Sequence, residues 1–402
     1  MDLRKRLAQL DRLTRRPKES LALEAGPSEG TRPTRETLAR LGLTSRDTEQ
    51  GPLWTVESTD AVAEPTVPLP DMAEVFSQGH CARPQPGDIL FLDTETTGLA
   101  GGTGTIAFLV GVSWWADGGL VTRQYFLPDP GHEPAMLADL ALLAAGFEVL
   151  VTFNGASFDL PLLCTRARLS RMDDPLATLI GWDLLVPARR LWGHRLDNCR
   201  QQTLESEICR TNRLAGDIDG SRIPQSWFDF LATGEPGLLP NVLTHNRRDM
   251  VGMALVFREV VRVCSLIDRP AAAGGCDLGG TPWDLAWALG RICERRRDTA
   301  SSLALLEWAV REAPAGDFSS RRFLADAVRI LKRGGDWALV EDLLSRGLVL
   351  YPDESWLHRE AAILYEHRMV DLARALDHAA KSGEDHRLDR LLKLMGADRS
   401  GA

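Results

Sequence analysis

"LFLDTETTGL", residues 90–99, combines a run of apolar residues with two acidic residues at its end. The apolar run predicts a buried strand. Asp93 and Glu95 lie two positions apart on that strand, so they point to the same face. Two neighbouring carboxylates repel one another, and burying them without partners costs several kcal/mol. This stretch therefore predicts a compensating positive charge, supplied by the protein or by a bound cation.

Two later stretches supply further carboxylates. "TFNGASFDLPLL" (152–163) places Asp159 in the first turn of a helix that follows a strand, and "HNRRDMVGMALVF" (245–257) places Asp249 one helical turn beyond His245. Taken alone, each acid is also compatible with an ordinary helix-start or surface charge. Together, four carboxylates on separate elements share a small space only when cations neutralise them, and oxygen ligands suit Mg²⁺ or Mn²⁺. We therefore expect two divalent cations, about 3.5–4 Å apart, acting on a phosphodiester.

These stretches resemble the motifs of a known family. "FLDTETTGL", "TFNGASFDLPLL" and "HNRRD" resemble the three motifs of the DEDD (DnaQ-like) 3′–5′ exonucleases, which have a ribonuclease-H-like fold. "GGTGTIAFLVG" and "DLLVPARRLWGHRLDNCRQQTLE" resemble the YprB-type branch, whose members often carry C-terminal helical repeats. The resemblance implies that Asp93, Glu95, Asp159 and Asp249 bind the metal ions. It also implies that Asp93 bridges both ions, and that Glu95 and Asp249 complete the more buried one.

His245 departs from the two main subgroups of that family. One subgroup has a tyrosine four residues before the last aspartate and the other has a histidine five residues before it, whereas His245 stands four residues before Asp249. Residues at positions i and i+4 share a helix face, so His245 can still face the metal ions. A neutral imidazole there would accept a proton from the attacking water. The alternative is a histidine that only caps the helix.

Three residues beside the acidic motifs are candidates for contact with the substrate. Thr94 lies between the first two acids, and Asn154 and Phe158 belong to the stretch that precedes Asp159 in the second motif. By the resemblance, residues such as Asn154 and Phe158 border the 3′ end of the strand that is cut. Phe158 is equally compatible with a place in the apolar core.

The stretch "ARRLWGHRLDNCR" (188–200) contributes two further candidates, Arg190 and Arg195. Arginines beside an aromatic residue suit phosphate pairing and base stacking in a groove for single strands. The alternative is a solvated helix face whose arginines form ion pairs within the protein, with Asp197, Glu205 and Glu207.

The order of apolar runs predicts a mixed α/β sheet, and the resemblance implies that this sheet is of the ribonuclease-H-like type. "ILFLDTE", "TIAFLVGVSWW" and "LVTRQYFL" are joined by glycine-rich turns and predict three antiparallel strands. "EVLVTFNG" and "IGWDLL" alternate with helical segments, which predicts parallel strands in the same sheet. The sheet is then flanked by helices, and an all-α part follows it.

The all-α part contains an internal offset. "ILKRGGDWALVEDLLSRG" (330–347) and "ILYEHRMVDLARALDHAA" (363–380) align at a shift of 33 residues, which resembles degenerate tetratricopeptide repeats. An ordinary helical bundle is the alternative. The predicted organisation has four parts: a basic N-terminal arm and largely irregular linker (1–86), the exonuclease domain (87–268), a linker (269–282) and the helical repeats (283–400).

Composition restricts the class of protein. The 402 residues carry a net charge of −9, which argues against coating of nucleic acid by bulk electrostatics. No run of 18 apolar residues predicts a membrane span, and the scattered cysteines without a CxxC pair predict reduced thiols in the cytoplasm. We expect a cytoplasmic, metal-dependent 3′–5′ exonuclease acting on DNA or RNA, with helical repeats that bind a protein partner or the substrate. A structure-selective endonuclease on the same fold and an inactive scaffold are the alternatives.

Overall fold

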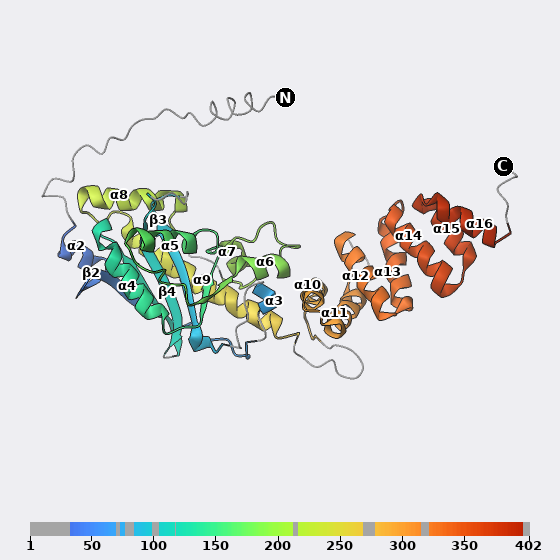
Figure 1. Cartoon of the computed structure of the whole chain (residues 1–402), viewed down its shortest axis with the longest axis horizontal. Coiled ribbons are helices and arrows are strands. Elements are labelled where there is room, and N and C mark those ends of the chain that lie inside the picture. The colour runs from blue at the N-terminus through green and yellow to red at the C-terminus, as the bar shows by residue number, and fades with distance from the viewer. Residues whose placement is uncertain are drawn as a thin grey trace, which may run out of the picture.

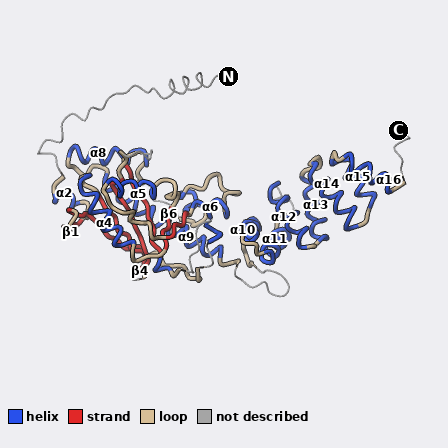
Figure 2. Tube along the Cα trace, in the orientation of Figure 1, coloured by secondary structure: helices blue, strands red, loops and turns tan. Residues whose placement is uncertain are grey.

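The computed structural model describes residues 33–69, 73–76, 84–98, 104–116, 118–211, 216–267, 278–314 and 321–396. A seven-stranded mixed sheet with helices on both faces is followed by a series of helices (Figure 1). Figure 2 shows that the strands are confined to the N-terminal part and that only helices and loops follow α9. The predicted fold class, a ribonuclease-H-like mixed sheet followed by an all-helical part, is confirmed.

The sheet has the strand order β1-β2-β5-β4-β3-β6-β7. Its first five strands in this order pair antiparallel, and β6 and β7 continue the sheet parallel to β3. The strands are β1 (Thr44–Thr48), β2 (Gly51–Asp60), β3 (Ile89–Thr96), β4 (Ala107–Ala116), β5 (Gly119–Phe126), β6 (Val149–Thr152) and β7 (Ile180–Asp183). The last five correspond to the strands that the sequence predicts.

The prediction of a largely irregular segment up to residue 86 is wrong for its middle part. A short helix, α2 (Arg35–Arg40), precedes β1, and residues 55–60 of β2 pair with β5. β1 and β2 carry few apolar residues because they lie at the edge of the sheet, where only Leu53 and Trp54 of the two strands are buried. Composition does not distinguish such an edge strand from a loop, because its stability comes from hydrogen bonds to its neighbour. The predicted helix in residues 1–20 lies outside the described residues.

Alternation along β3 assigns its side chains to two apolar cores. Ile89 and Phe91 belong to the core on one face, and Leu90 and Leu92 belong to the core on the other. The first face is covered by α3 (Ala73–Phe76), α6 (Leu185–Leu191), α7 (Gln201–Glu207) and most of α9 (Leu239–Cys264). The second face is covered by α4 (Glu133–Ala144), α5 (Asp159–Leu169) and α8 (Ile223–Thr233).

The C-terminal helices pack consecutively, each against the next in the chain. They are α10 (Trp283–Arg295), α11 (Thr299–Glu312), α12 (Arg321–Gly334), α13 (Trp337–Leu350), α14 (Ser355–Leu364), α15 (Leu372–Ser382) and α16 (Asp385–Leu394). The second helix of each of three pairs begins after a capping aspartate, in turn Asp298, Asp336 and Asp371. α15 begins later than the shift of 33 residues predicts, because residues Tyr365–Met369 form a turn of π-helix first.

The helical part is packed against the sheet part. α10 contacts α6 and α3, and Nε2 of His194 lies 2.9 Å from Oδ2 of Asp284. The ring of His194 also meets that of Trp287 edge-on, with 5.0 Å between their centroids. One apolar core runs from the sheet through α9 and α6 into α10 and onward. No helix in the described ranges is long and apolar enough to cross a membrane.

Candidate metal and nucleic-acid site

The end of β3 determines which helix each acidic side chain meets. Asp93 and Glu95 continue the alternation of Phe91 and point toward α9, whereas Thr94 points to the opposite face, toward α5. The contacts agree with this: Asp93 Oδ2 accepts a hydrogen bond of 2.9 Å from Nδ2 of Asn246 on α9. The hydroxyl of Thr94 donates to Oδ1 of Asp159, the first residue of α5. The end of β3 thus contacts both helices that carry the other two predicted acids, α5 with Asp159 and α9 with Asp249.

On the α9 side, one imidazole and two carboxylates meet. His245 and Asp249 lie one helical turn apart, and Nε2 of His245 is 3.2 Å from Oδ2 of Asp249. The same Nε2 is 3.9 Å from Oε1 of Glu95. One ligand atom from each of these three residues lies within 4.8 Å of the other two. Among the described residues, this group of three is therefore a candidate to hold a metal ion.

On the α5 side, the loop between β6 and α5 is held by Asp183 at the end of β7. The carboxylate of Asp183 accepts hydrogen bonds from the backbone N–H of Asn154 (2.8 Å) and of Ala156 (3.3 Å). Asn154 has a φ of 64°, a left-handed conformation that these bonds stabilise. Asp183 therefore positions the loop that leads to Asp159.

Burial and mutual repulsion act strongly on these acids. Burial, followed by the charges of Asp249, Asp159 and Glu95, raises the pKa of Asp93 well above its ordinary value. Burial, followed by Asp249, Asp159 and Asp217, raises the pKa of Glu95 to about 8. Burial also raises the pKa of Asp159. The four predicted acids are therefore within electrostatic reach of one another.

This electrostatic environment fits divalent cations. Buried carboxylates that repel one another stay ionised only when a positive charge lies among them. Carboxylate oxygens and an imidazole nitrogen are the donors that divalent cations take. The residues present therefore fit the ions that the sequence predicts.

Asn246 belongs to the site but is not among the predicted residues. Its side chain is fully buried, and its Oδ1 accepts a hydrogen bond of 2.9 Å from Nε2 of Gln124 while its Nδ2 donates to Asp93. Gly111 makes room for it, because a Cβ there would lie 2.3 Å from Oδ1 of Asn246. The signal for Asn246 is present in the sequence: it stands three residues before Asp249 and so shares its helix face.

Asp217 also belongs to the site, and no sequence pattern indicates it. Its Oδ1 lies 2.8 Å from Nδ1 of His245 and 3.7 Å from a guanidinium nitrogen of Arg248. It stands in the connection between α7 and α8, whose residues 212–215 lie outside the described residues. An aspartate in an irregular connection has no periodicity that would assign it to a face.

A pocket of about 390 Å³ lies beside Asp93 and Asp159. Its walls include Thr94, Asn154 and Phe158, the three residues predicted to contact the substrate. The alternative that Phe158 is part of the core is wrong, because its side chain is 58% exposed.

The two arginines predicted to contact the substrate do not line this pocket. A guanidinium nitrogen of Arg190 donates to the backbone carbonyl of Val75, at 2.7 Å. Arg195 approaches Asp284 of α10, at 3.5 Å. These contacts agree with the alternative of interactions within the protein, although the partners differ from the expected acids. Arg190 thus contacts α3, and Arg195 contacts α10.

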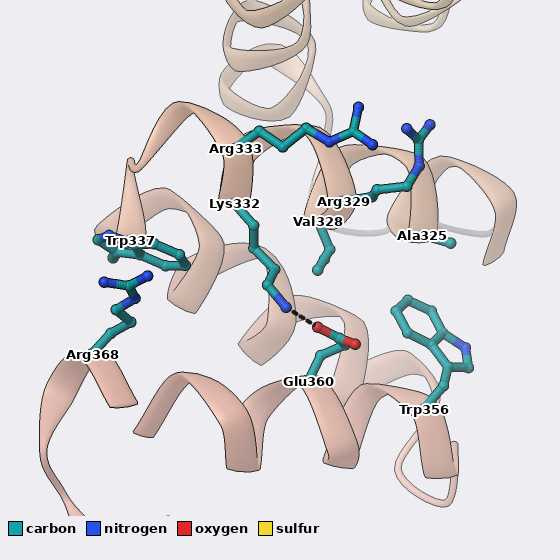
Figure 3. A pocket seen from close by; sticks show the side chains of 9 residues that line it. All are labelled: Ala325, Val328, Arg329, Lys332, Arg333, Trp337, Trp356, Glu360 and Arg368. Atoms are coloured by element: carbon teal, nitrogen blue, oxygen red, sulfur yellow. Dashed lines mark hydrogen bonds and ion pairs between the residues drawn. The ribbon is translucent and has the colours of Figure 1, made fainter. Parts of the chain in front are cut away.

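A second pocket, of about 550 Å³, lies in the helical part (Figure 3). Figure 3 shows Trp356 and Trp337 on opposite sides of Lys332, whose Nζ lies 2.5 Å from Oε2 of Glu360. The guanidinium of Arg368 stacks 4.3 Å above the ring of Trp337. The pocket combines aromatic rings with four cationic side chains, those of Arg329, Lys332, Arg333 and Arg368.

Comparisons with known proteins agree with this fold. Residues 90–261, which contain all four predicted acids, match the model of the RNase_H superfamily. The fold of that superfamily supports hydrolysis of phosphodiester bonds, implies a nucleic-acid substrate and typically uses divalent metal ions. The chain is also 38% identical over 305 residues to a Bacillus subtilis (strain 168) protein described as "Uncharacterized protein YprB". The aligned part covers 74% of this chain and 70% of that protein. The chain therefore belongs to the family of YprB, within the RNase_H superfamily.

Proposed function

We propose that the protein is a metal-dependent nuclease that removes nucleotides from the 3′ end of DNA or RNA. The observation that carries this proposal is the convergence of Asp93, Glu95, Asp159 and Asp249 from one strand and two helices, with mutual repulsion that a cation would relieve. Their order along the chain and their motifs resemble those of DEDD exonucleases, which supports this type among the nucleases of the superfamily.

Each residue of the site has a proposed role in metal binding or in the orientation of a metal ligand. Asp93, Glu95, Asp159 and Asp249 would hold two divalent cations. When bound, such ions stabilise the negative charge on the attacking and leaving oxygens of a phosphodiester. Asp93 is the proposed shared ligand, because the charges of the three other acids all act on it. Thr94 orients Asp159, and Asn246 orients Asp93. His245 is the fifth proposed catalytic residue, beside the four acids.

The pocket beside Asp93 supports action at a chain end. Its volume, about 390 Å³, lies in the range of pockets that hold one small molecule and suits a terminal nucleotide. The exposed ring of Phe158 on its wall would stack on the terminal base, a contact that contributes about 1–3 kcal/mol per base. Phe158→Ala should therefore raise KM for single strands and change kcat little.

A cleavage assay with end-labelled substrates tests this proposal. Single- and double-stranded DNA and RNA carry the label at either the 5′ or the 3′ end, and the reactions contain Mg²⁺ or Mn²⁺. We expect a ladder of shortened 5′-labelled strands and immediate release of a labelled mononucleotide from the 3′ end. Asp93→Asn should abolish both. Asp229→Asn, an exposed acid of α8 that hydrogen-bonds only within its helix face, is the matched control and should cut normally.

Other patterns in the same assay would favour the alternatives. Cleavage of a circular single strand or at a branch point would show an endonuclease and would refute exonuclease action. Binding of nucleic acid without cleavage under any of these conditions would refute a nuclease and favour a scaffold that acts through its helices. We propose that the protein acts in the reducing cytoplasm, because its seven cysteines are scattered along the sequence and form no CxxC pair.

We propose that the C-terminal helices are tetratricopeptide-like repeats that bind a protein partner or the substrate beyond the active site. The support is the repeated aspartate cap and the basic, aromatic pocket of Figure 3. Trp356→Ala combined with Arg368→Ala should weaken that binding and leave cleavage of short oligonucleotides unchanged. Equal binding by this double variant and the wild type would refute a role of the pocket.

A further inference from the structure

We propose that His245 is a metal ligand, and that Glu95, His245 and Asp249 form a site for a transition-metal ion in which Asp217 orients the imidazole. This inference rests on the proposed metal-dependent function and deepens it, because it names the class of ion and assigns residues to it. It replaces the role of general base that the sequence predicts for His245.

The separations of the three side chains fit one ion. Two ligands that each bind at about 2.1 Å from an ion lie about 3.0 Å apart at right angles and about 3.4 Å apart in a tetrahedron. Nε2 of His245 lies 3.2 Å from Oδ2 of Asp249 and 3.9 Å from Oε1 of Glu95. The first separation is already that of two ligands on one ion, and a small rotation of the Glu95 side chain brings the second to the same value.

Asp217 determines which nitrogen of His245 faces this place. Its Oδ1 lies 2.8 Å from Nδ1, so this carboxylate holds the ring with Nε2 facing Glu95 and Asp249. A carboxylate on the far nitrogen is the usual partner of a histidine that binds a metal, because it holds the ring and raises the basicity of the ligating nitrogen. Arg248 lies 3.7 Å from the same oxygen of Asp217 and balances its charge.

This environment suits a ligand better than a general base. A general base needs room for a water molecule beside its nitrogen, whereas Nε2 of His245 lies 3.2 Å from Asp249 and 3.9 Å from Glu95. The side chains of His245, Glu95 and Asp249 are only 11%, 13% and 19% exposed. A place bounded by an imidazole nitrogen and two carboxylates fits a cation, because the cation offsets the repulsion between the carboxylates.

The donor set indicates the class of ion. Mg²⁺ prefers oxygen ligands in a regular octahedron, whereas an imidazole nitrogen favours transition metals. The Asp93 and Asp159 side of the cluster presents carboxylates, and a hard ion suits it. The Glu95, His245 and Asp249 side adds nitrogen and should select Mn²⁺ and later transition metals over Mg²⁺. The two ion positions are therefore chemically unequal.

Electron paramagnetic resonance of the Mn²⁺-loaded full-length protein tests this site without any cleavage reaction. Loss of the free Mn²⁺ signal during titration gives the affinity, and electron spin echo modulation detects a ¹⁴N nucleus bound to Mn²⁺. We expect ¹⁴N coupling in the wild type, loss of that coupling in His245→Gln, and Mn²⁺ affinity lowered roughly 10–100-fold in Asp217→Asn. Mg²⁺ in excess should leave the coupled signal in place.

A matched control is available in the helical part. The imidazole of His367 is 52% exposed and lies 3.6 Å from Glu366, so His367→Gln removes a histidine that is paired with a carboxylate at another place. This variant should keep both the ¹⁴N coupling and the affinity. The decisive measurement is made on the wild type, so it holds even when a variant fails to fold.

Bound Mn²⁺ without ¹⁴N coupling in the wild type would overturn this inference, as would coupling that persists in His245→Gln. Cleavage measured on the same samples separates the two proposals. Cleavage without coupling would support the nuclease and refute the transition-metal site. Coupling without cleavage would support the site and refute the nuclease.

Discussion

Replacement of Asn246 by alanine provides the most direct test of how the fold prepares Asp93. The amide of Asn246 donates to Asp93 at 2.9 Å and is held from behind by Gln124, also at 2.9 Å. This hydrogen bond lowers the pKa of Asp93 against the stronger opposing effects of burial and of neighbouring acids. Its loss should therefore raise that pKa further and leave the carboxyl protonated to a higher pH.

The magnitude follows from the strength of the bond. A hydrogen bond to a charged group contributes about 1.5–3 kcal/mol, and one pKa unit corresponds to about 1.4 kcal/mol. The pKa of Asp93 should therefore rise further in Asn246→Ala, because the lost bond favours the ionised carboxylate. A cation must then displace a more tightly held proton, so metal affinity should fall by roughly 10–100-fold while Asp93 is protonated in the free protein. The deficit should shrink as rising pH ionises Asp93 in both proteins.

Calorimetric titration with Mn²⁺ across a series of pH values from about 6 to 9 measures this change, with a thermal melt to show that the variant is folded. Asn241→Ala is the matched control, because Asn241 is an exposed asparagine on the same helix. Its titrations should coincide with those of the wild type. Equal affinities for Asn246→Ala and the wild type at the lower pH values would refute the reasoning. A deficit of constant size at every pH would show that Asn246 acts on packing and not on the proton of Asp93.

Three further predictions concern stability and packing. Because the pKa of Glu95 rises from 4.5 to about 8 on folding, the native protein binds more protons than the unfolded chain between these values. The free energy of unfolding of the metal-free protein should therefore fall as pH rises through that interval; calorimetry with a chelator at pH 5 and pH 8 checks this, and Glu95→Gln should flatten the dependence. Gly111→Ala places a Cβ 2.3 Å from the Asn246 amide, so denaturant titration should show a loss of about 1–3 kcal/mol together with weaker Mn²⁺ binding. Gly87→Ala, where nothing lies within 4 Å of the added Cβ, should change neither. Trp287→Ala should cost about 3–5 kcal/mol because that side chain is 1% exposed; an unchanged denaturation midpoint would mean that α10 contributes little to the shared core.

The sequence predicts the central strands and the acids at their ends because both signals are local. The apolar run before Asp93 and the alternation along β3 involve only neighbouring residues, and they already assign Asp93 and Glu95 to one face. The spacing of His245 and Asp249 likewise predicts a shared helix face, and the structure has it. These parts of the candidate site required no knowledge of distant contacts.

Other features depend on partners that are remote in the sequence. Asn246 meets Asp93 across 153 residues, and Asp217 meets His245 from a connection without periodicity. Arg195 resembles a nucleic-acid contact in its local sequence, yet it lies against Asp284 on α10. Sequence patterns identify the chemical group that a side chain carries, and only the fold determines which residues that group contacts.

The domain organisation likewise has parts that the sequence predicts and parts that only the tertiary structure shows. The sequence by itself determined the α/β part, the acidic motifs and the helical character of the C-terminal part, since each of these follows from periodicity within one element. Only the tertiary structure decided that β1 and β2 complete the sheet and that α10 shares an apolar core with α6. The physical reason is that an edge strand and a helix interface are stabilised by the surface they pack on, and that surface is assembled from distant segments.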